Sequence, residues 1–201
     1  MLALGAPRAQ TSTFERTFPA AAGARLDVST HRGKITITAG DTDEVAVSGT
    51  VTARSGLNMP MNRGELAANV ADHPPVRQQG ATIELRPPAD PLVDRATTID
   101  YVVRVPPNTI IVAVSDSGDV SVTGVTGAVS VRTQSGAIAV AIGPTAAVTI
   151  DATTGSGSID IDRSLGDFET SKGRAHGDIR GGGPLCQLTS KSGSIHVSSA
   201  R

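Results

Sequence analysis

The sequence predicts an all-β protein, a right-handed parallel β-solenoid of the single-stranded β-helix type, with one short helix in an insertion. Three observations predict this fold: a short phrase recurs at intervals of 16 to 21 residues, apolar side chains alternate within it, and a glycine begins each copy. A repeat this short cannot enclose a core alone, so its copies must stack and bury their apolar faces on one another. Crossovers between parallel strands favour the right-handed form.

The phrase fills residues 110–197 and has one earlier copy. Its marker glycines are Gly33, Gly118, Gly136, Gly157, Gly177 and Gly193. Two residues after each glycine stands an aliphatic residue: Ile35, Val120, Ile138, Ile159, Ile179 and Ile195. Because side chains of a strand alternate between its faces, we expect these aliphatic residues to form one inward row. We expect the glycines to lie at corners, where a residue able to adopt positive φ costs least.

Hydroxyl side chains support the corner interpretation. Serine precedes most of the glycines, at Ser117, Ser135, Ser156 and Ser192, whereas His176 takes that place in the fourth copy. A serine hydroxyl at a tight turn can bond the local backbone. Apolar pairs before the corners predict a second inward face, made of Val112 and Val114, Val129 and Val131, Ile150 and Ala152, and Cys186 and Leu188.

Residues 13–198 are interpreted as one domain. Residues 13–53 would supply a first coil and a cap strand that contains Phe14 and Phe18. Residues 54–80 form an insertion, because Pro60, Pro74 and Pro75 interrupt the strand pattern. Connecting strands are expected at 83–85 and 99–105 within residues 81–109, and the regular coils occupy 110–198.

The insertion contains a helix signal. Asn62 followed by Glu65 is typical of a helix N-cap with an acid three residues on, and the apolar segment 66–70 follows. We therefore expect a short helix there. Gly64 in the first turn weakens the signal, and a mobile polar loop is the alternative.

Residues 1–12 are small and apolar and resemble the tail of a secretory signal, with Ala9 placed as the last residue before cleavage. A disordered N-terminus is the alternative. The first interpretation predicts export to the periplasm or cell surface; a cytoplasmic location stays open.

The amino-acid composition limits the classes of partner that the protein can bind. A formal net charge of −1 predicts no strong attraction to nucleic acid, and no stretch is apolar and long enough for a transmembrane segment. Aromatic residues make up 2%, which disfavours base-stacking surfaces and aromatic sugar shelves. Cys186 is the one cysteine, so no internal disulfide can form, and its place in an apolar pair predicts a small buried side chain.

No residue pattern predicts catalysis, a cofactor or a metal. The outward carboxylates are Asp119, Asp160 and Asp178, and Asp160 with Arg180 is expected to form an ion pair between adjacent coils. If these carboxylates are dispersed or all paired, an enzyme built on them is ruled out, and if two of them face an open groove unpaired, that enzyme is favoured. The histidines His31, His73, His176 and His196 lack zinc-ligand spacing, and no phosphate-binding loop occurs.

The run from Tyr101 to Pro106, followed by 112–114, 117–122 and successive Ser-Gly-x-Ile steps, resembles the DUF4097 family of β-strand-repeat, adhesin-like proteins. The resemblance covers roughly residues 13–198. It implies a right-handed parallel β-solenoid and an envelope or exported location, and it brings no catalytic residues.

These observations predict a non-enzymatic bacterial envelope scaffold, adhesin-like, whose repetitive surface associates with a protein, a glycan or a second copy of itself. One alternative is a carbohydrate-active β-helix enzyme with a carboxylate site. Another is a polymer-forming scaffold like the bactofilins.

Overall fold

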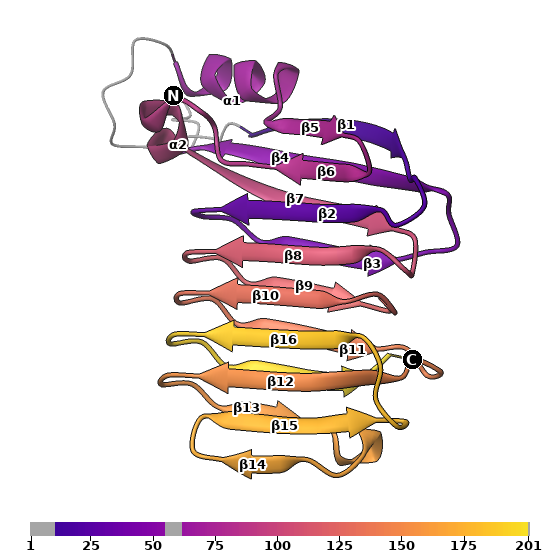
Figure 1. Cartoon of the computed structure of the whole chain (residues 1–201). Helices are drawn as coiled ribbons and strands as arrows, with labels where there is room; N and C mark the ends of the chain where they lie inside the picture. The colour runs from indigo at the N-terminus through magenta and orange to yellow at the C-terminus, as the bar shows by residue number, and fades with distance from the viewer. Residues whose placement is uncertain (1–10, 55–61, 201) are drawn as a thin grey trace, which may run out of the picture.

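The structure is a computed structural model that describes residues 11–54 and 62–200, and it confirms a mostly β fold. Two mixed sheets lie one behind the other (Figure 1). Sheet A has the order β1 (Thr11–Pro19), β4 (Glu44–Ala53), β7 (Thr97–Val105), β3 (Ile35–Ala39), β9 (Val120–Thr123), β11 (Ile138–Ile142), β17 (Ile195–Ser199), β13 (Ile159–Ile161). Sheet B has the order β14 (Glu169–Ser171), β15 (Arg174–Ile179), β12 (Val148–Thr154), β16 (Leu185–Ser190), β10 (Val129–Thr133), β8 (Ile110–Ser115), β2 (Arg25–Thr30), β6 (Thr82–Leu85), β5 (Val76–Gln79).

Five coils form the regular part of the molecule, and each gives one strand to sheet B and the next to sheet A. They are β2 with β3, β8 with β9, β10 with β11, β12 with β13, and β16 with β17. Neighbouring coils pair in parallel in both sheets. Alternate side chains of both sheets point inward into one core of Val, Ile, Leu and Ala.

The inward row of sheet A contains five of the six residues in the predicted row. Pairing joins Ile35 to Val120, Val120 to Ile138, Ile138 to Ile195, and Ile195 to Ile159. Ile159 is half-buried because β13 is the edge of the sheet, whereas the others are 0–1% exposed.

The fourth copy of the phrase does not form a coil, so the prediction for Ile179 and Gly177 is wrong. Both residues lie in β15 of sheet B, which runs antiparallel to β12 and pairs Ile179 with Val148. The reason is a reversal of the chain after β13, where a 3-10 turn, η1 (Arg163–Leu165), leads into the antiparallel pair β14 and β15. The prediction of a wholly parallel stack is wrong for the same reason. At the other end, β1, β4 and β7 are also antiparallel.

The order of the coils in space differs from their order in the sequence. The last coil, β16 with β17, lies between β10 with β11 on one side and β12 with β13 on the other (Figure 1). The second inward face also needs one correction, since Ile111 and Ala113 are buried in β8 whereas Val112 and Val114 face outward. The other apolar pairs, including Cys186 and Leu188, are buried as expected.

The predicted helix is present as α1 (Arg63–Asp72), with the capping box between Asn62 and Glu65 in place. It packs on β1 and β4 through Leu66 and Val70 and covers one end of the stack (Figure 1). A second helix, α2 (Pro91–Ala96), was not predicted; Asp90 caps it by accepting from the Leu92 N–H. Neither helix is long and apolar enough to cross a membrane. Ala9 and Pro60 lie outside the described residues.

Candidate functional site

A column of glycines lines the corner where each coil passes from sheet B to sheet A. A Cβ atom on Gly118, Gly136, Gly193 or Gly157 would overlap the carbonyl oxygen of the next glycine in the stack, namely Gly33, Gly118, Gly136 and Gly193 respectively. Of these five, only Gly33 has positive φ, at 108°. The corner glycines are therefore needed for the close approach of successive coils, and the positive-φ explanation applies to Gly33 alone. Gly177 lies outside this column, beside Phe168.

A second column, of buried hydroxyl groups, runs beside the glycines. Each of its members stands three residues before a corner glycine: Thr30, Ser115, Thr133, Ser190 and Thr154. The Gly118 and Gly193 N–H groups donate to the Oγ atoms of Ser115 and Ser190 at 2.8 and 2.7 Å. Thr133 Oγ1 donates to the carbonyl of Gly136 at 2.8 Å. These bonds satisfy backbone groups that the sharp corner would otherwise bury unpaired.

The sequence carried a signal for these hydroxyls that was missed. Every true corner has Ser or Thr, two further residues and then Gly, whereas the fourth copy has Arg174 at the corresponding position. That difference separates the real corners from the false one.

The exposed serines next to the glycines act between coils. The Oγ atoms of Ser117, Ser135 and Ser192 donate to the carbonyls of His31, Asp116 and Gln134 at 3.0, 3.1 and 2.9 Å. Each acceptor belongs to the neighbouring coil, so the expectation of a local backbone bond is wrong for these three. The serines add to the backbone bonds that hold consecutive corners together.

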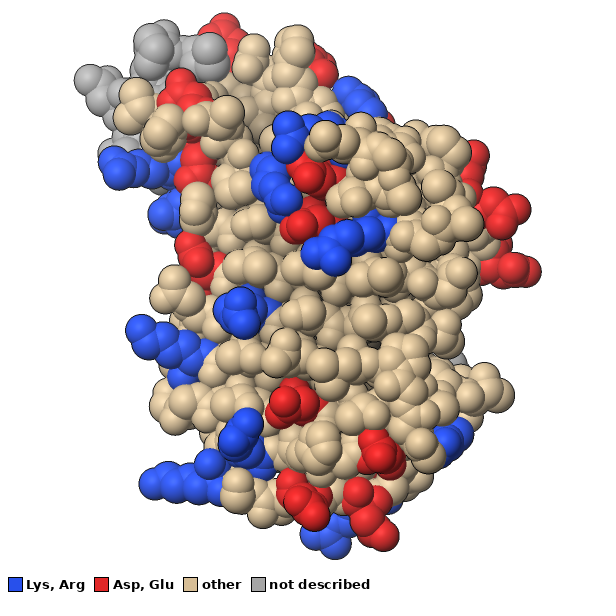
Figure 2. Space-filling model, viewed as in Figure 1, with Lys and Arg blue, Asp and Glu red and all other residues tan. Residues whose placement is uncertain are grey.

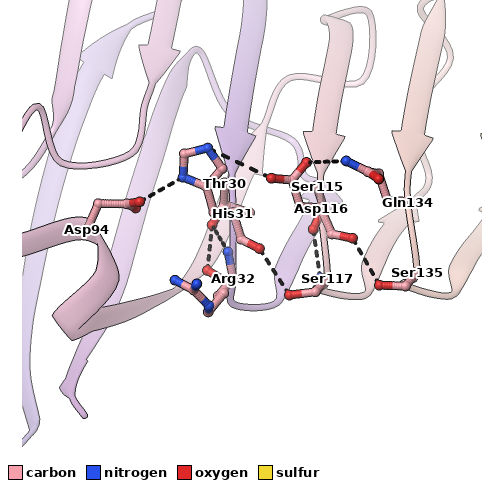
Figure 3. A network of polar contacts seen from close by, with 10 residues as sticks. Thr30, His31, Arg32, Asp94, Ser115, Asp116, Ser117, Gln134 and Ser135 are labelled. Carbon is pink, nitrogen blue, oxygen red and sulfur yellow. Dashed lines mark hydrogen bonds and ion pairs between the residues drawn. The ribbon is translucent and has the colours of Figure 1, made fainter. Parts of the chain in front are cut away.

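Polar side chains project outward from the same corners and define what we call the corner surface: His31, Asp116, Gln134 and Lys191. Figure 3 shows its first part. His31 Nδ1 lies 2.9 Å from Asp94 Oδ2 of α2, and His31 Nε2 lies 3.8 Å from Asp116 Oδ2. Gln134 Nε2 donates to Asp116 Oδ1 at 3.3 Å. One residue per coil is thereby presented at a spacing of about 4.8 Å.

The corner surface can bind a ligand, because its hydrogen-bond donors, acceptors and charges repeat at a fixed spacing on a rigid stack of coils. The Ser117 hydroxyl is committed to the His31 carbonyl, so it is not set against an imidazole nitrogen as a nucleophile would be. Within residues 11–54 and 62–200, no group of three or more His, Cys, Asp or Glu side chains is placed to hold a metal ion.

The three predicted outward carboxylates are dispersed, and each has a partner. Asp119 Oδ1 accepts from the Ala137 N–H at 2.9 Å, and Asp178 Oδ1 accepts from Thr149 Oγ1 at 2.7 Å on sheet B. Asp160 Oδ2 lies 3.1 Å from His196 Nδ1 on sheet A. They form no shared site.

The predicted pair of Asp160 with Arg180 is wrong. Arg180 follows the antiparallel strand β15 and donates from Nη1 to the Ala146 carbonyl at 3.0 Å. His196 occupies the position in the neighbouring coil that Arg180 was expected to fill.

One polar row was not visible in the sequence. Asp151, His176 and Glu169 lie side by side on β12, β15 and β14, and they line a hollow of about 450 Å³ together with Arg174. The row exists because β14 and β15 run antiparallel, which the repeat pattern did not predict. On the face drawn in Figure 2, most acidic and basic residues lie toward the two ends of the stack, and the middle carries a few basic residues on its left and is uncharged on its right.

No protein-family model matches the chain, and no curated protein matches it. Among solved structures, the chain is similar to a protein described as "a putative cell adhesion protein" from Clostridium sporogenes ATCC 15579. The similarity has a TM-score of 0.54 at 10% sequence identity and covers 94% of this chain and 100% of the other. At this identity the likeness is one of fold.

Proposed function

We propose that this protein is a member of the DUF4097 family and a non-enzymatic scaffold of the bacterial cell envelope. Its coils would form a right-handed β-solenoid that holds the corner surface ready for a protein, a glycan or a second copy of the chain. Export to the periplasm or cell surface is part of this proposal.

The corner surface is the observation that carries it. Two internal columns, one of glycines and one of hydroxyls, fix the spacing of the corners, while the outward residues vary from coil to coil. A rigid, repeating support with a variable polar exterior suits the recognition of an extended partner. A neighbour of the same fold described as a putative cell adhesion protein supports the same function.

Binding by the corner surface is tested with a triple variant, Asp116→Ala, Gln134→Ala and Lys191→Ala. The matched control is Thr38→Ala, Thr123→Ala and Ser198→Ala, which lie on the outer face of sheet A across coils of the same stack. Glycan arrays and pull-downs from envelope extracts should give a binder that the corner variant loses and the control keeps. Equal binding by both variants, or binding by neither variant nor the wild type, would contradict the proposal.

Location is tested by fractionating the source cells with an antibody against the chain. The protein should be found in the periplasm or on the surface. Recovery in the cytoplasmic fraction alone would contradict the envelope proposal and leave the binding test unaffected.

A carbohydrate-active enzyme is the second candidate, and the row of Asp151, His176 and Glu169 favours it. The carboxylates of Asp151 and Glu169 line the same hollow, on either side of His176. Their backbones are two strand spacings apart, about 9.6 Å, which lets the two side chains bring their carboxyl groups to the roughly 6.5–9.5 Å separation of inverting glycosidases. Release of reducing sugar from envelope polysaccharides, lost in Glu169→Gln and Asp151→Asn, would support this candidate; no release by the wild type would remove it.

A further inference from the structure

The coil made of β16 and β17, which we call the terminal coil, is the last in the sequence but lies inside the stack. In sheet B, β16 pairs with β10 on one side and with β12 on the other. In sheet A, β17 pairs with β11 and β13 in the same way. Figure 1 shows β16 between β10 and β12. When the chain is made from its N-terminus, both neighbours of the terminal coil therefore exist before it does.

The space that the terminal coil fills between its two neighbouring coils, which we call the slot, accepts only a segment with particular residues at particular positions. Cys186, Leu188, Ile195 and Val197 are at most 2% exposed, so they are core residues. The columns at the corner also pass through the terminal coil. Thr133 Oγ1 and Ser190 Oγ lie 3.1 Å apart, within hydrogen-bond distance, and Thr154 Oγ1 donates to the Gly193 carbonyl at 3.0 Å. An occupant needs inward aliphatics, a hydroxyl and a glycine in this register, and a second copy of the chain supplies that segment.

The terminal coil is attached through a glycine-rich hinge at residues 180–183. Arg180 has φ 52° and is the one non-glycine with positive φ among residues 11–54 and 62–200. Gly181 and Gly182 follow with φ 85° and 80°. A left-handed conformation is unfavourable for arginine, so a rearranged hinge can relieve strain while every contact of the terminal coil is kept.

We propose that two copies of this chain exchange their terminal coils, each filling the slot of the other, to give a closed dimer. Exchange recreates the same pairs and the same core, so the balance between monomer and dimer depends on the hinge and on protein concentration. The exchange describes how the self-association included in the proposed function would occur. Its biological role rests on that proposed function.

Mixed disulfides test the exchange without altering the hinge. Val129 of β10 and Cys186 of β16 are paired residues, so a cysteine at 129 lies beside the thiol at 186. Chains carrying Val129→Cys with Cys186→Ser are unfolded in urea together with wild-type chains and refolded with oxidised glutathione. Exchange predicts a heterodimer on a non-reducing gel whose yield rises with protein concentration. Its absence at every concentration overturns the proposal.

A shortened hinge makes the dimer obligatory. Strands β15 and β16 lie on opposite sides of β12, roughly 9.6 Å apart. Deletion of residues 181–183 leaves a link between them that spans only roughly 10 Å when fully extended, and this link must also turn. Light scattering after gel filtration should show a dimer, whereas a matched insertion of Gly-Ser-Gly at the same site should give monomer. A monomeric deletion variant with native circular dichroism overturns the proposal. If the deletion variant fails to fold, the disulfide result decides.

The two proposals fail separately. A monomer whose corner surface binds an envelope partner overturns exchange and leaves the proposed function standing. A dimer formed by exchange that binds no envelope component supports the exchange and contradicts the proposed function.

Discussion

At the scale of single residues, close backbone approach explains the repeated glycines better than turn conformation does. Gly136 is buried and its hydrogen points at the Gly118 carbonyl, with no room for a methyl group. Gly143 offers a contrast: a Cβ there would meet nothing closer than 4.0 Å, and its φ is not positive. The two glycines therefore separate the effect of stacking from the general effect of removing a glycine.

Gly136→Ala should lower the free energy of unfolding by about 3 kcal/mol, because the coils must move apart or the corner must distort. Gly143→Ala should be neutral or stabilising by up to about 1 kcal/mol, since alanine reduces the entropy of the unfolded chain. Urea melts of both variants measure this. Equal losses would show that the corner column is not tightly stacked.

Cys186 gives a pH prediction at the same scale. Burial raises the pKa of its thiol to about 12 from the ordinary value of 9.0. The unfolded chain ionises near the ordinary value, so this contribution to stability is complete below pH 9 and is lost as pH rises toward 12. The free energy of unfolding should fall by up to roughly 1.4 kcal/mol per pH unit across that window.

The measurement compares urea melts of the wild type and Cys186→Ala between pH 7 and 10.5. Every other titratable group is common to the two proteins, so the difference between the two pH profiles isolates the thiol. Parallel profiles would contradict the burial of Cys186.

At the scale of elements, local patterns were enough to predict most strands of the regular coils, the inward faces of most of them, and α1. Alternation identified the inward positions of β9, β11 and β17, and the Asn62 and Glu65 pair identified the start of α1. The reversal at β15 was not predicted, because the fourth copy keeps the glycine and the aliphatic residue of the other copies at the expected spacing, although His176 replaces their serine. α2, with six residues, is too short for a periodic signal.

Inward and outward positions of one sheet should respond very differently to substitution. Ile138→Asp buries an unpaired charge between Val120 and Ile195 and should cost about 4 kcal/mol or more. Ile159→Asp should cost less, because β13 is an edge strand. Asp160→Ala should change stability by less than about 1 kcal/mol, since its pair with His196 is exposed. Urea melts in which all three variants lose equal stability would contradict the assigned register.

At the scale of the whole molecule, the order of the coils could not be derived from the sequence. Every coil presents the same inward aliphatics, hydroxyl and glycine, so the local signals fit a stack in chain order equally well. The choice depends on long-range pairing, in which the reversal through β14 and β15 returns the chain past β12 before the terminal coil begins. The corner surface was harder still to predict, because its neighbours come from different coils and from α2.

The most direct test of the stack is a methyl NOE spectrum of three inward residues of sheet B, namely Val131 in β10, Leu188 in β16 and Ala152 in β12. The structure pairs Leu188 with both of the others. Strong contacts from Leu188 to Val131 and to Ala152 are therefore expected, with none between Val131 and Ala152, which are two strand spacings or about 9.6 Å apart. A strong contact between Val131 and Ala152 would show that the coils stack in chain order and would contradict the account.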